Sequence, residues 1–247
     1  KAITLDGNGK TLTSTAGRAI NVSGANGVTI KNLTIDAKGE RAINIIQNAT
    51  NVTIDNVTAT AANYTVNVAS SAPNAVVAIK NSTLNGLCTV NVSAAGADVT
   101  VDNSTVNCND NNTTEGEAYA ALSLNKDAVG GSIVATNTTV NVTEGSDSNK
   151  GRNGAEDGTV TINGGTITEG YATERGGNIY VHGGWDTSTD STGVKTFVPY
   201  IGKLIIKDGV VSNGVAGKLD AEGNPTSGSG GNITVFGQYA TSSYTIG

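Results

Sequence analysis

The 247-residue chain has no Met, one His, one Trp, two Phe and only 4% aromatic residues. A compact α/β enzyme needs more large apolar side chains than this to fill a deep core, whereas a thin core with many turns needs fewer. No apolar run approaches the ~18 residues that would indicate a transmembrane helix, so we expect no membrane insertion by this segment. We also find no signal peptide, and the first residues already follow a strand-like pattern. We therefore expect the chain to be part of a longer protein.

Basic residues are also few, because 15 Lys and Arg stand against 21 Asp and Glu and leave a net charge of −6. Proteins that bind nucleic acids usually present a clustered basic face, and no such cluster is visible here. Nucleic acid is therefore excluded as an expected partner.

What the chain does contain is an internal repeat, which is the first feature to seek in a sequence of this kind. Seven eight-residue segments alternate apolar and polar residues, mostly around a central polar residue, and their starts lie 24, 25, 22, 34, 27 and 44 residues apart. Alternation with period two indicates half-buried strands. The segments run from Val28 to Ile35, Val52 to Ala59, Val77 to Leu84, Val99 to Val106, Ile133 to Val140, Val160 to Ile167 and Leu204 to Val211.

The centre of each segment carries a residue that tolerates a left-handed backbone. We expect the strand to bend there, and stacked side chains at the bend to form an asparagine ladder. The predicted ladder consists of Asn32, Asn56, Asn81, Asn103 and Asn137, with Gly164 and Asp208 at the later bends.

A second family of short strands recurs in step with the first. Its first four members begin 23, 23 and 24 residues apart, as one coil of a β-helix requires. The family comprises residues 19–22, 42–45, 65–68, 89–92, 121–124, 178–181 and 232–235.

Together the two families predict an all-β fold, a right-handed parallel β-helix (a solenoid) of about eight coils with three short strands per coil. We expect one domain over residues 1–247, with regular coils over 1–145 and coils with long loop insertions over 146–247. A β-sandwich is the alternative, but its strands usually arrive every 8–12 residues without a shared registered motif.

The segments from Val28 and from Val52, with Asn at the tight bend, resemble coils of the pectate-lyase-like β-helix superfamily over about residues 1–145. Beyond these, the motifs Gly164-Gly165-Thr166-Ile167 and Gly176-Gly177-Asn178-Ile179-Tyr180-Val181 are similar to repeats of large bacterial cell-surface proteins. This resemblance implies an extracellular, adhesin-like role. Enzymes of the superfamily use a basic residue beside bound calcium, or several Asp with a His, and their characteristic triplets are absent here.

Candidate binding residues gather near the only His and the only Trp. Loops that leave a rigid scaffold often carry binding sites, and aromatic rings can stack on sugar faces. We therefore select Tyr180, His182, Trp185 and Tyr200 as candidate ligand-binding residues, with folding of these rings back onto the coil as the alternative.

The two cysteines and two acidic stretches of the sequence each allow two interpretations. Cys88 and Cys108 fall at similar, though not identical, phases of adjacent coils, so they form either a disulfide or two free thiols. The Asp- and Asn-rich stretches from Asn107 to Glu117 and from Thr143 to Asp157 offer oxygen ligands that suit Ca²⁺, although solvated loops are the simpler interpretation. No other cofactor or metal site is expected.

The leading hypothesis is a structural or adhesive segment of an extracellular bacterial surface protein, which displays loops and self-assembles through open coil ends. Its partners would be other coils or subunits of the same protein, and a host glycan or protein. The alternatives are a polysaccharide lyase or hydrolase, for which no catalytic residue can be named, and a non-catalytic glycan-binding module.

Overall fold

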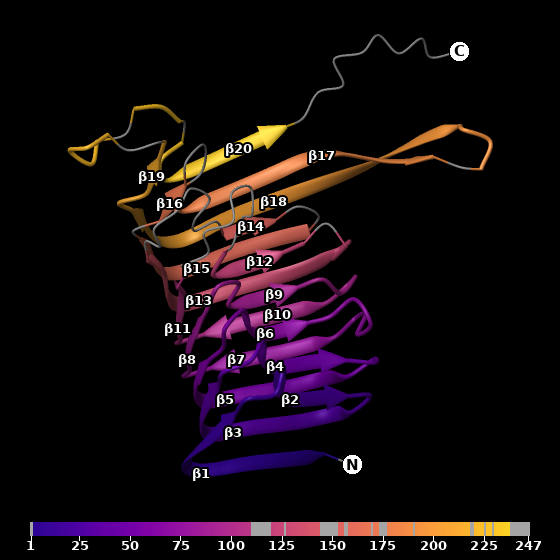
Figure 1. The fold of residues 1–247 in the computed structure, drawn as a ribbon, viewed down its shortest axis with the longest axis vertical. Coiled ribbons are helices and arrows are strands. Elements are labelled where there is room, and N and C mark those ends of the chain that lie inside the picture. Colours follow the sequence, from indigo (N-terminus) through magenta and orange to yellow (C-terminus); the bar gives the residue numbers. More distant parts are fainter. Residues whose placement is uncertain are drawn as a thin grey trace.

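The computed structural model describes residues 2–109, 120–125, 127–143, 153–155, 158–168, 170–172, 177–189, 191–217, 220–224, 226–228 and 230–237. These residues form β-strands and turns, with no helix among them. The strands are stacked one above another from β1 to β20 (Figure 1).

The first stack contains eight levels, which are joined by parallel pairing. Two of the levels are each split into two strands. In order, the stack consists of β1 (Ile3–Ser14), β3 (Asn26–Ala37), β5 (Thr50–Thr60), β7 (Val76–Lys80) with β8 (Thr83–Gly86), β10 (Asp98–Asp102) with β11 (Thr105–Asn109), β13 (Gly131–Thr143), β15 (Gly158–Thr168) and β18 (Lys195–Ser212).

The second stack also has eight levels in parallel pairing. It consists of β2 (Arg18–Ser23), β4 (Arg41–Ile46), β6 (Tyr64–Val68), β9 (Val90–Val92), β12 (Leu122–Leu124), β14 (Asn153–Ala155), β17 (Ile179–Thr189) and β20 (Ile233–Gly237). A short third sheet pairs β16 (Tyr171–Ala172) with β19 (Val215–Ala216). The predicted parallel β-solenoid is therefore confirmed.

The register of the stacks places like residues above one another. Val28 pairs with Val52 and Ile30 with Ile54, and Ile54 in turn pairs with Ile79. In the second stack Ile43 pairs with Val66. A spacing of about 4.8 Å between strands brings these side chains into direct contact along the axis.

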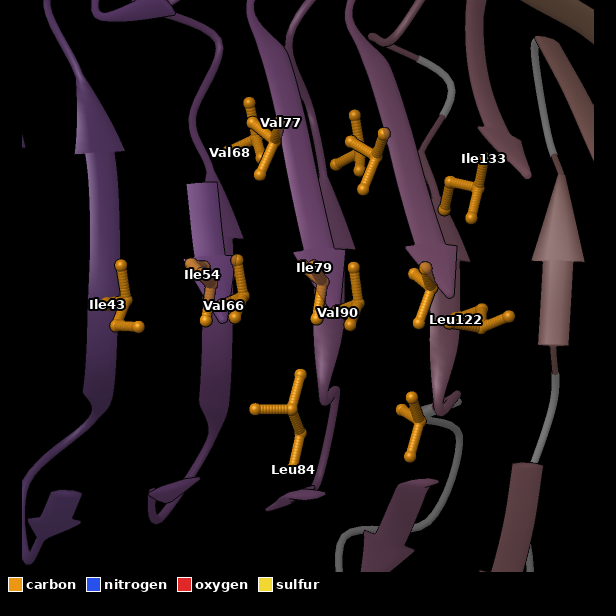
Figure 2. Packing of buried hydrophobic residues seen from close by; sticks show 14 of the residues in the cluster. Ile43, Ile54, Val66, Val68, Val77, Ile79, Leu84, Val90, Leu122 and Ile133 are labelled. Atoms are coloured by element: carbon orange, nitrogen blue, oxygen red, sulfur yellow. The ribbon is translucent and has the colours of Figure 1, made fainter. Parts of the chain in front are cut away.

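Aliphatic columns fill the interior, and Figure 2 shows part of them. Ile54 and Ile79 of the first stack are fully buried, as are Ile43, Val66 and Val90 of the second stack. Burying a side chain of this size stabilises a fold by roughly 1.5–3 kcal/mol. Because each coil is small, the core needs only one or two such side chains on each side of a bend, which explains how the chain folds with few aromatic residues.

The bends occur where the sequence predicts them. Asn32, Asn56, Asn81, Asn103 and Asn137 all have positive φ, between 46° and 54°, and Gly164 follows the same pattern at 87°. The bend divides a long strand such as β3 into two, which gives three strand segments per coil. The predicted bend at Asp208 is wrong. A register shift next to Asp208 moves the left-handed conformation to Gly209, at a φ of 113°.

The predicted asparagine ladder forms in two sections. The side chain of Asn56 donates to Asn32 Oδ1 at 2.9 Å, and that of Asn103 donates to Asn81 Oδ1 at 2.8 Å. Between these sections Asn81 donates to Asp55 Oδ1 at 2.8 Å instead.

A substitution series at Asn56 separates the two roles of the bend residue. We expect Asn56→Gly to lose only the side-chain bond, about 1 kcal/mol, because glycine adopts positive φ without strain. Asn56→Ala should cost a further 1–2 kcal/mol or so, because its Cβ crowds the carbonyl in this conformation. Urea unfolding of the two variants measures the difference, and equal midpoints would contradict the proposed strain.

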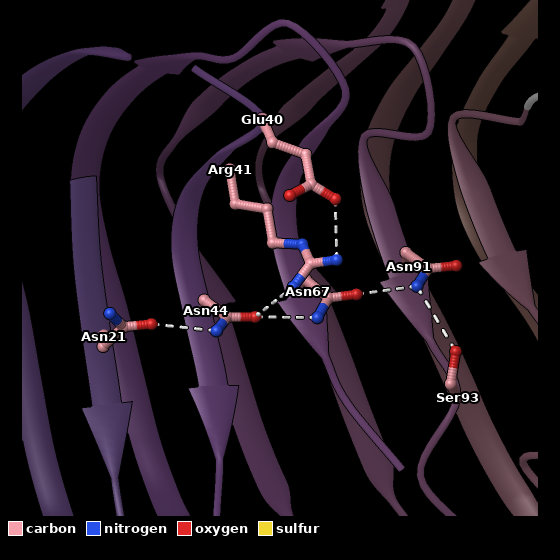
Figure 3. A network of polar contacts seen from close by, with 7 residues as sticks. All are labelled: Asn21, Glu40, Arg41, Asn44, Asn67, Asn91 and Ser93. Carbon is pink, nitrogen blue, oxygen red and sulfur yellow. Dashed lines mark hydrogen bonds and ion pairs between the residues drawn. The ribbon is translucent and has the colours of Figure 1, made fainter. Parts of the chain in front are cut away.

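A second, more deeply buried ladder lies in the other stack, where sequence analysis did not place one (Figure 3). Each asparagine donates its Nδ2 to the Oδ1 of the coil before it. The bonds run from Asn44 to Asn21 at 2.9 Å, Asn67 to Asn44 at 2.8 Å, Asn91 to Asn67 at 2.7 Å and Asn125 to Asn91 at 3.0 Å. A third column joins Asn107 to Asn85 and Asn141 to Asn107. The ladders satisfy polar groups that burial would otherwise leave unpaired.

Candidate functional site

The candidate site is a two-stranded arm that leaves the solenoid near its C-terminal end (Figure 1). Residues Gly183–Thr189 of β17 pair with Lys195–Ile201 of β18 in the antiparallel sense. The segment predicted as a loop insertion is therefore a β-hairpin. Antiparallel pairing supplies hydrogen-bond partners to a backbone that extends beyond the stacked coils.

The four candidate residues divide between the arm and its base. Tyr180 lies within the stack and pairs with Gly154 and Thr234, and His182 pairs with Phe236. Trp185 and Tyr200 lie in the arm itself. Tyr180 and His182 therefore lie in the stack and Trp185 and Tyr200 in the arm, so the four residues do not form a single site.

The register of the arm divides it into two faces, because residues directly opposite each other share a face and successive residues alternate. Trp185 pairs with Pro199, and two residues further along Thr187 pairs with Phe197. Tyr200 pairs with Gly184 and therefore belongs to the opposite face from Trp185. Phe197 and Pro199 are thus the positions that share the Trp185 face.

An amide network centred on the buried Asn178 lies at the base of the arm. Asn178 Oδ1 accepts a bond from Gly170 N at 2.7 Å, and its Nδ2 donates to Ser212 O and to Asn232 Oδ1, each at 2.7 Å. Asn232 Oδ1 also accepts from Gly214 N at 2.9 Å. This network explains why Asn follows a glycine pair both at Gly176-Gly177-Asn178 and at Gly230-Gly231-Asn232.

The glycine before Asn178 has a packing role of its own. A Cβ on Gly177 would collide with the backbone of Gly231 and Val215. The motif therefore specifies close approach between coils, and it fixes the segment from which the arm extends.

A second polar cluster surrounds Arg41 on an outer edge (Figure 3). Its guanidinium contacts Glu40 at 2.8 Å and lies 5.3 Å from the centre of the Tyr64 ring. Burial raises the pKa of Tyr64 above its ordinary value. Arg18 of the preceding coil pairs with Arg41, so the two arginines occupy equivalent positions of adjacent coils. The Nε of Arg41 is buried without a hydrogen-bond partner.

The two cysteines are free thiols and are both buried. Cys108 pairs with Gly86, two residues before Cys88, so the register does not superimpose the two positions. Cys108 Sγ lies 2.8 Å from Leu87 O. Of the two alternatives, the structure therefore shows two free thiols and no disulfide between Cys88 and Cys108.

Burial should make the thiols unreactive in the folded protein. Desolvation raises the pKa of Cys88 to about 11, so this side chain remains a neutral thiol at pH 8, and the thiolate is the reactive form. We expect negligible reaction with a thiol-specific chromogenic disulfide at pH 8, and reaction of both thiols in guanidinium chloride. Rapid labelling of the folded chain would contradict this burial.

The predicted calcium sites fall mostly at residues 110–117, 144–152 and 156–157, which lie outside the described residues. Within the described residues, no group of three or more His, Cys, Asp or Glu side chains is arranged to hold a metal ion. The same part of the chain contains no helix long and apolar enough to cross a membrane.

Comparison with known proteins identifies no matching family model, no matching curated protein and no matching solved structure. The stacked coils, the ladders and the arm are therefore the observations from which a function can be argued.

Proposed function

We propose that the chain is a structural and adhesive segment of an extracellular bacterial surface protein, in which a stiff solenoid holds a projecting arm away from its surroundings. The observation that carries this proposal is the continuous stacking of two eight-level sheets that ends in the β17–β18 hairpin. The likeness of its coils to pectate-lyase-like β-helices and of its Gly-Gly-Asn motifs to bacterial surface repeats supports the same role.

Stiffness follows from the way the coils are joined. Main-chain bonds, aliphatic columns and amide ladders all cross every boundary among the first five levels, so bending the solenoid there would strain all three at once. The core is closely packed, with Ile54 and Ile79 fully buried, and close-packed interiors have low compressibility. A rigid spacer of this kind keeps a binding element at a fixed distance from its anchor.

Surface labelling tests the location. Antibodies raised against the chain should label intact cells of the source bacterium as strongly as permeabilised cells, once the signals are scaled to a known surface protein. Labelling confined to permeabilised cells would refute an extracellular role.

Glycan recognition by the arm is a second candidate function, which is favoured by the shared face of Trp185, Phe197 and Pro199. Flat apolar area with a polar edge suits the face of a sugar ring. On a glycan array, Trp185→Ala should weaken any binding by about tenfold. Val194→Ala, which removes an exposed side chain from the arm's turn, is the matched control. Equal binding by both variants would remove the Trp185 face from consideration.

A further inference from the structure

Among the described strands, the outer edge of the arm's first strand has no partner. Near the base of the arm, β17 pairs in parallel with β20, and this pairing ends at Gly183. Beyond Gly183, β17 pairs only with β18 within the described residues, as far as Thr189. A two-stranded hairpin that stands alone in water is marginally stable, and three strands are usually needed. A third strand on this edge would therefore stabilise the arm.

Backbone hydrogen bonds identify the groups that face this edge. Ile179 N donates to Asn232 O at 2.9 Å, so the odd-numbered residues of β17 direct their N–H and C=O groups toward β20. Because successive residues of a strand alternate in this respect, the same edge carries the N–H and C=O groups of Trp185, Thr187 and Thr189 in the arm. The open edge of the arm is thus a direct continuation of the edge that β20 occupies.

The outer edge of β18 is less suited to an added strand. Pro199 lies opposite Trp185, and proline has no N–H group. Since the N–H and C=O groups of Trp185 face away from β18, the two residues form a non-hydrogen-bonded pair, and the Pro199 nitrogen points to the outer edge. A strand on that edge would lack a donor at Pro199, and prolines at such positions protect sheet edges. The edge open to pairing is therefore that of β17.

The sequence that follows β20 repeats the sequence of the arm in β17. Residues 183–189 are Gly-Gly-Trp-Asp-Thr-Ser-Thr, and residues 237–243 are Gly-Gln-Tyr-Ala-Thr-Ser-Ser. The two segments are 54 residues apart, the same separation as Asn178 and Asn232. This separation is also the register in which β17 pairs with β20. Residues 238–243 lie outside the part of the chain that the structure describes, and continuing the register places them beside their equivalents in the arm.

We infer that residues 238–243 add a third strand to the arm, parallel to β17 and along its outer edge. The strand continues β20 in the register that the described residues already have. Tyr239 then lies beside Trp185, and Thr241 beside Thr187. The inference goes beyond the adhesive role proposed above, because it names a segment of this chain as the partner of the arm and holds whether or not the arm binds a glycan.

The third strand widens the face of the arm that carries Trp185. Directly paired residues of neighbouring strands lie on the same face of a sheet. Tyr239, Trp185 and Pro199 therefore form one row across three strands, with neighbouring strands about 4.8 Å apart. The arm thus presents a second aromatic ring beside its only Trp, on a sheet that is one strand broader than the hairpin.

Disulfide cross-linking tests the register of the third strand. A disulfide requires Cα atoms about 4.4–6.8 Å apart, which direct partners satisfy and residues offset by two positions exceed. The pair Thr187→Cys, Thr241→Cys should therefore oxidise at least about tenfold faster than the pair Thr187→Cys, Ser243→Cys. Cys88 and Cys108 are buried and serve as unreactive background.

Non-reducing electrophoresis of the oxidised chain distinguishes the possible occupants of the edge. A cross-link within one chain, at a rate independent of protein concentration, is the expected product. Equal rates for the two pairs would overturn the inference. Cross-linked dimers whose fraction rises with concentration would also overturn it, because a second copy would then occupy the edge.

The fluorescence of Trp185 is a second test, because this residue is the only Trp in the chain. In the extended register the Ala240 N–H faces β17, whereas the Thr241 N–H faces away. Ala240→Pro removes a hydrogen bond to β17, so it should shift the Trp185 emission to longer wavelength and increase its quenching by acrylamide. Thr241→Pro is the matched control, because an edge strand tolerates proline where its N–H faces outward, and it should change both quantities less.

Circular dichroism verifies that both proline variants fold. Trp185 emission and quenching that are the same in Ala240→Pro as in the wild-type chain would overturn the inference. Neither the cross-linking nor the fluorescence depends on cell-surface labelling or on glycan binding, so this inference and the proposed function can fail separately.

Discussion

We expect Ile54→Ala to lower the free energy of unfolding by about 2–5 kcal/mol, the usual cost of truncating a fully buried aliphatic side chain. Ile54 is completely buried between Ile30 and Ile79 in one column. Because the core is only one coil wide, no side chain behind the column can move in to fill the cavity. Urea unfolding measures the loss.

Thr53→Ala is the matched control for this prediction, because Thr53 is the adjacent residue and is partly exposed. Substitutions at such positions usually change stability by less than about 0.5 kcal/mol. If Ile54→Ala were as mild as Thr53→Ala, the column would not be the main source of stability.

The second large effect is expected in the buried ladder. Asn67 donates to Asn44 Oδ1 and accepts from Asn91 Nδ2, so Asn67→Ala removes two bonds and deprives groups on both sides of a partner. Each net bond contributes about 1 kcal/mol, and a buried group left unsatisfied costs about 1–3 kcal/mol more. We expect a total loss of roughly 2–4 kcal/mol on urea unfolding.

Asn21→Ala provides the comparison within the same ladder. Asn21 is exposed at the end of the ladder and only accepts a bond from Asn44. Its removal should cost about 1 kcal/mol. Equal losses at the two positions would show that depth in the ladder has no energetic consequence.

Much of the fold was predictable because the repeat combines two strong local signals. Alternation marks the strands, and a left-handed residue marks the bend, so Asn32, Asn56 and Asn81 could be placed before the register was known. The failure at Asp208 has a local cause. The register shift there transfers the bend to Gly209, and a single sequence does not reveal such a shift.

The buried ladder was visible in the sequence but was not recognised. Asn21, Asn44, Asn67 and Asn91 occupy the same place in four strands of the second family, so their stacking follows from the predicted register. Strand β14 was missed for a different reason. Its residues Asn153-Gly154-Ala155 have no apolar alternation, and only their neighbours in the stack define them as a strand.

The arm could not be predicted from the repeat pattern. Its strands pair with each other across a turn, so no coil of the solenoid repeats their sequence. The aromatic residues alone indicated a candidate site, but the division between the Trp185 and Tyr200 faces depends on antiparallel register, which only the structure supplies.

The central claim, that successive coils bring equivalent residues into register, is tested most directly by cross-linking on the outer face. Thr29 and Thr53 are direct partners on β3 and β5, whereas Asp55 lies two residues further along β5. Disulfides require Cα atoms about 4.4–6.8 Å apart. The Thr29→Cys, Thr53→Cys pair should therefore oxidise at least about tenfold faster than the Thr29→Cys, Asp55→Cys pair, with Cys88 and Cys108 remaining buried. Equal rates for the two pairs, or faster oxidation of the second, would contradict the stacked solenoid.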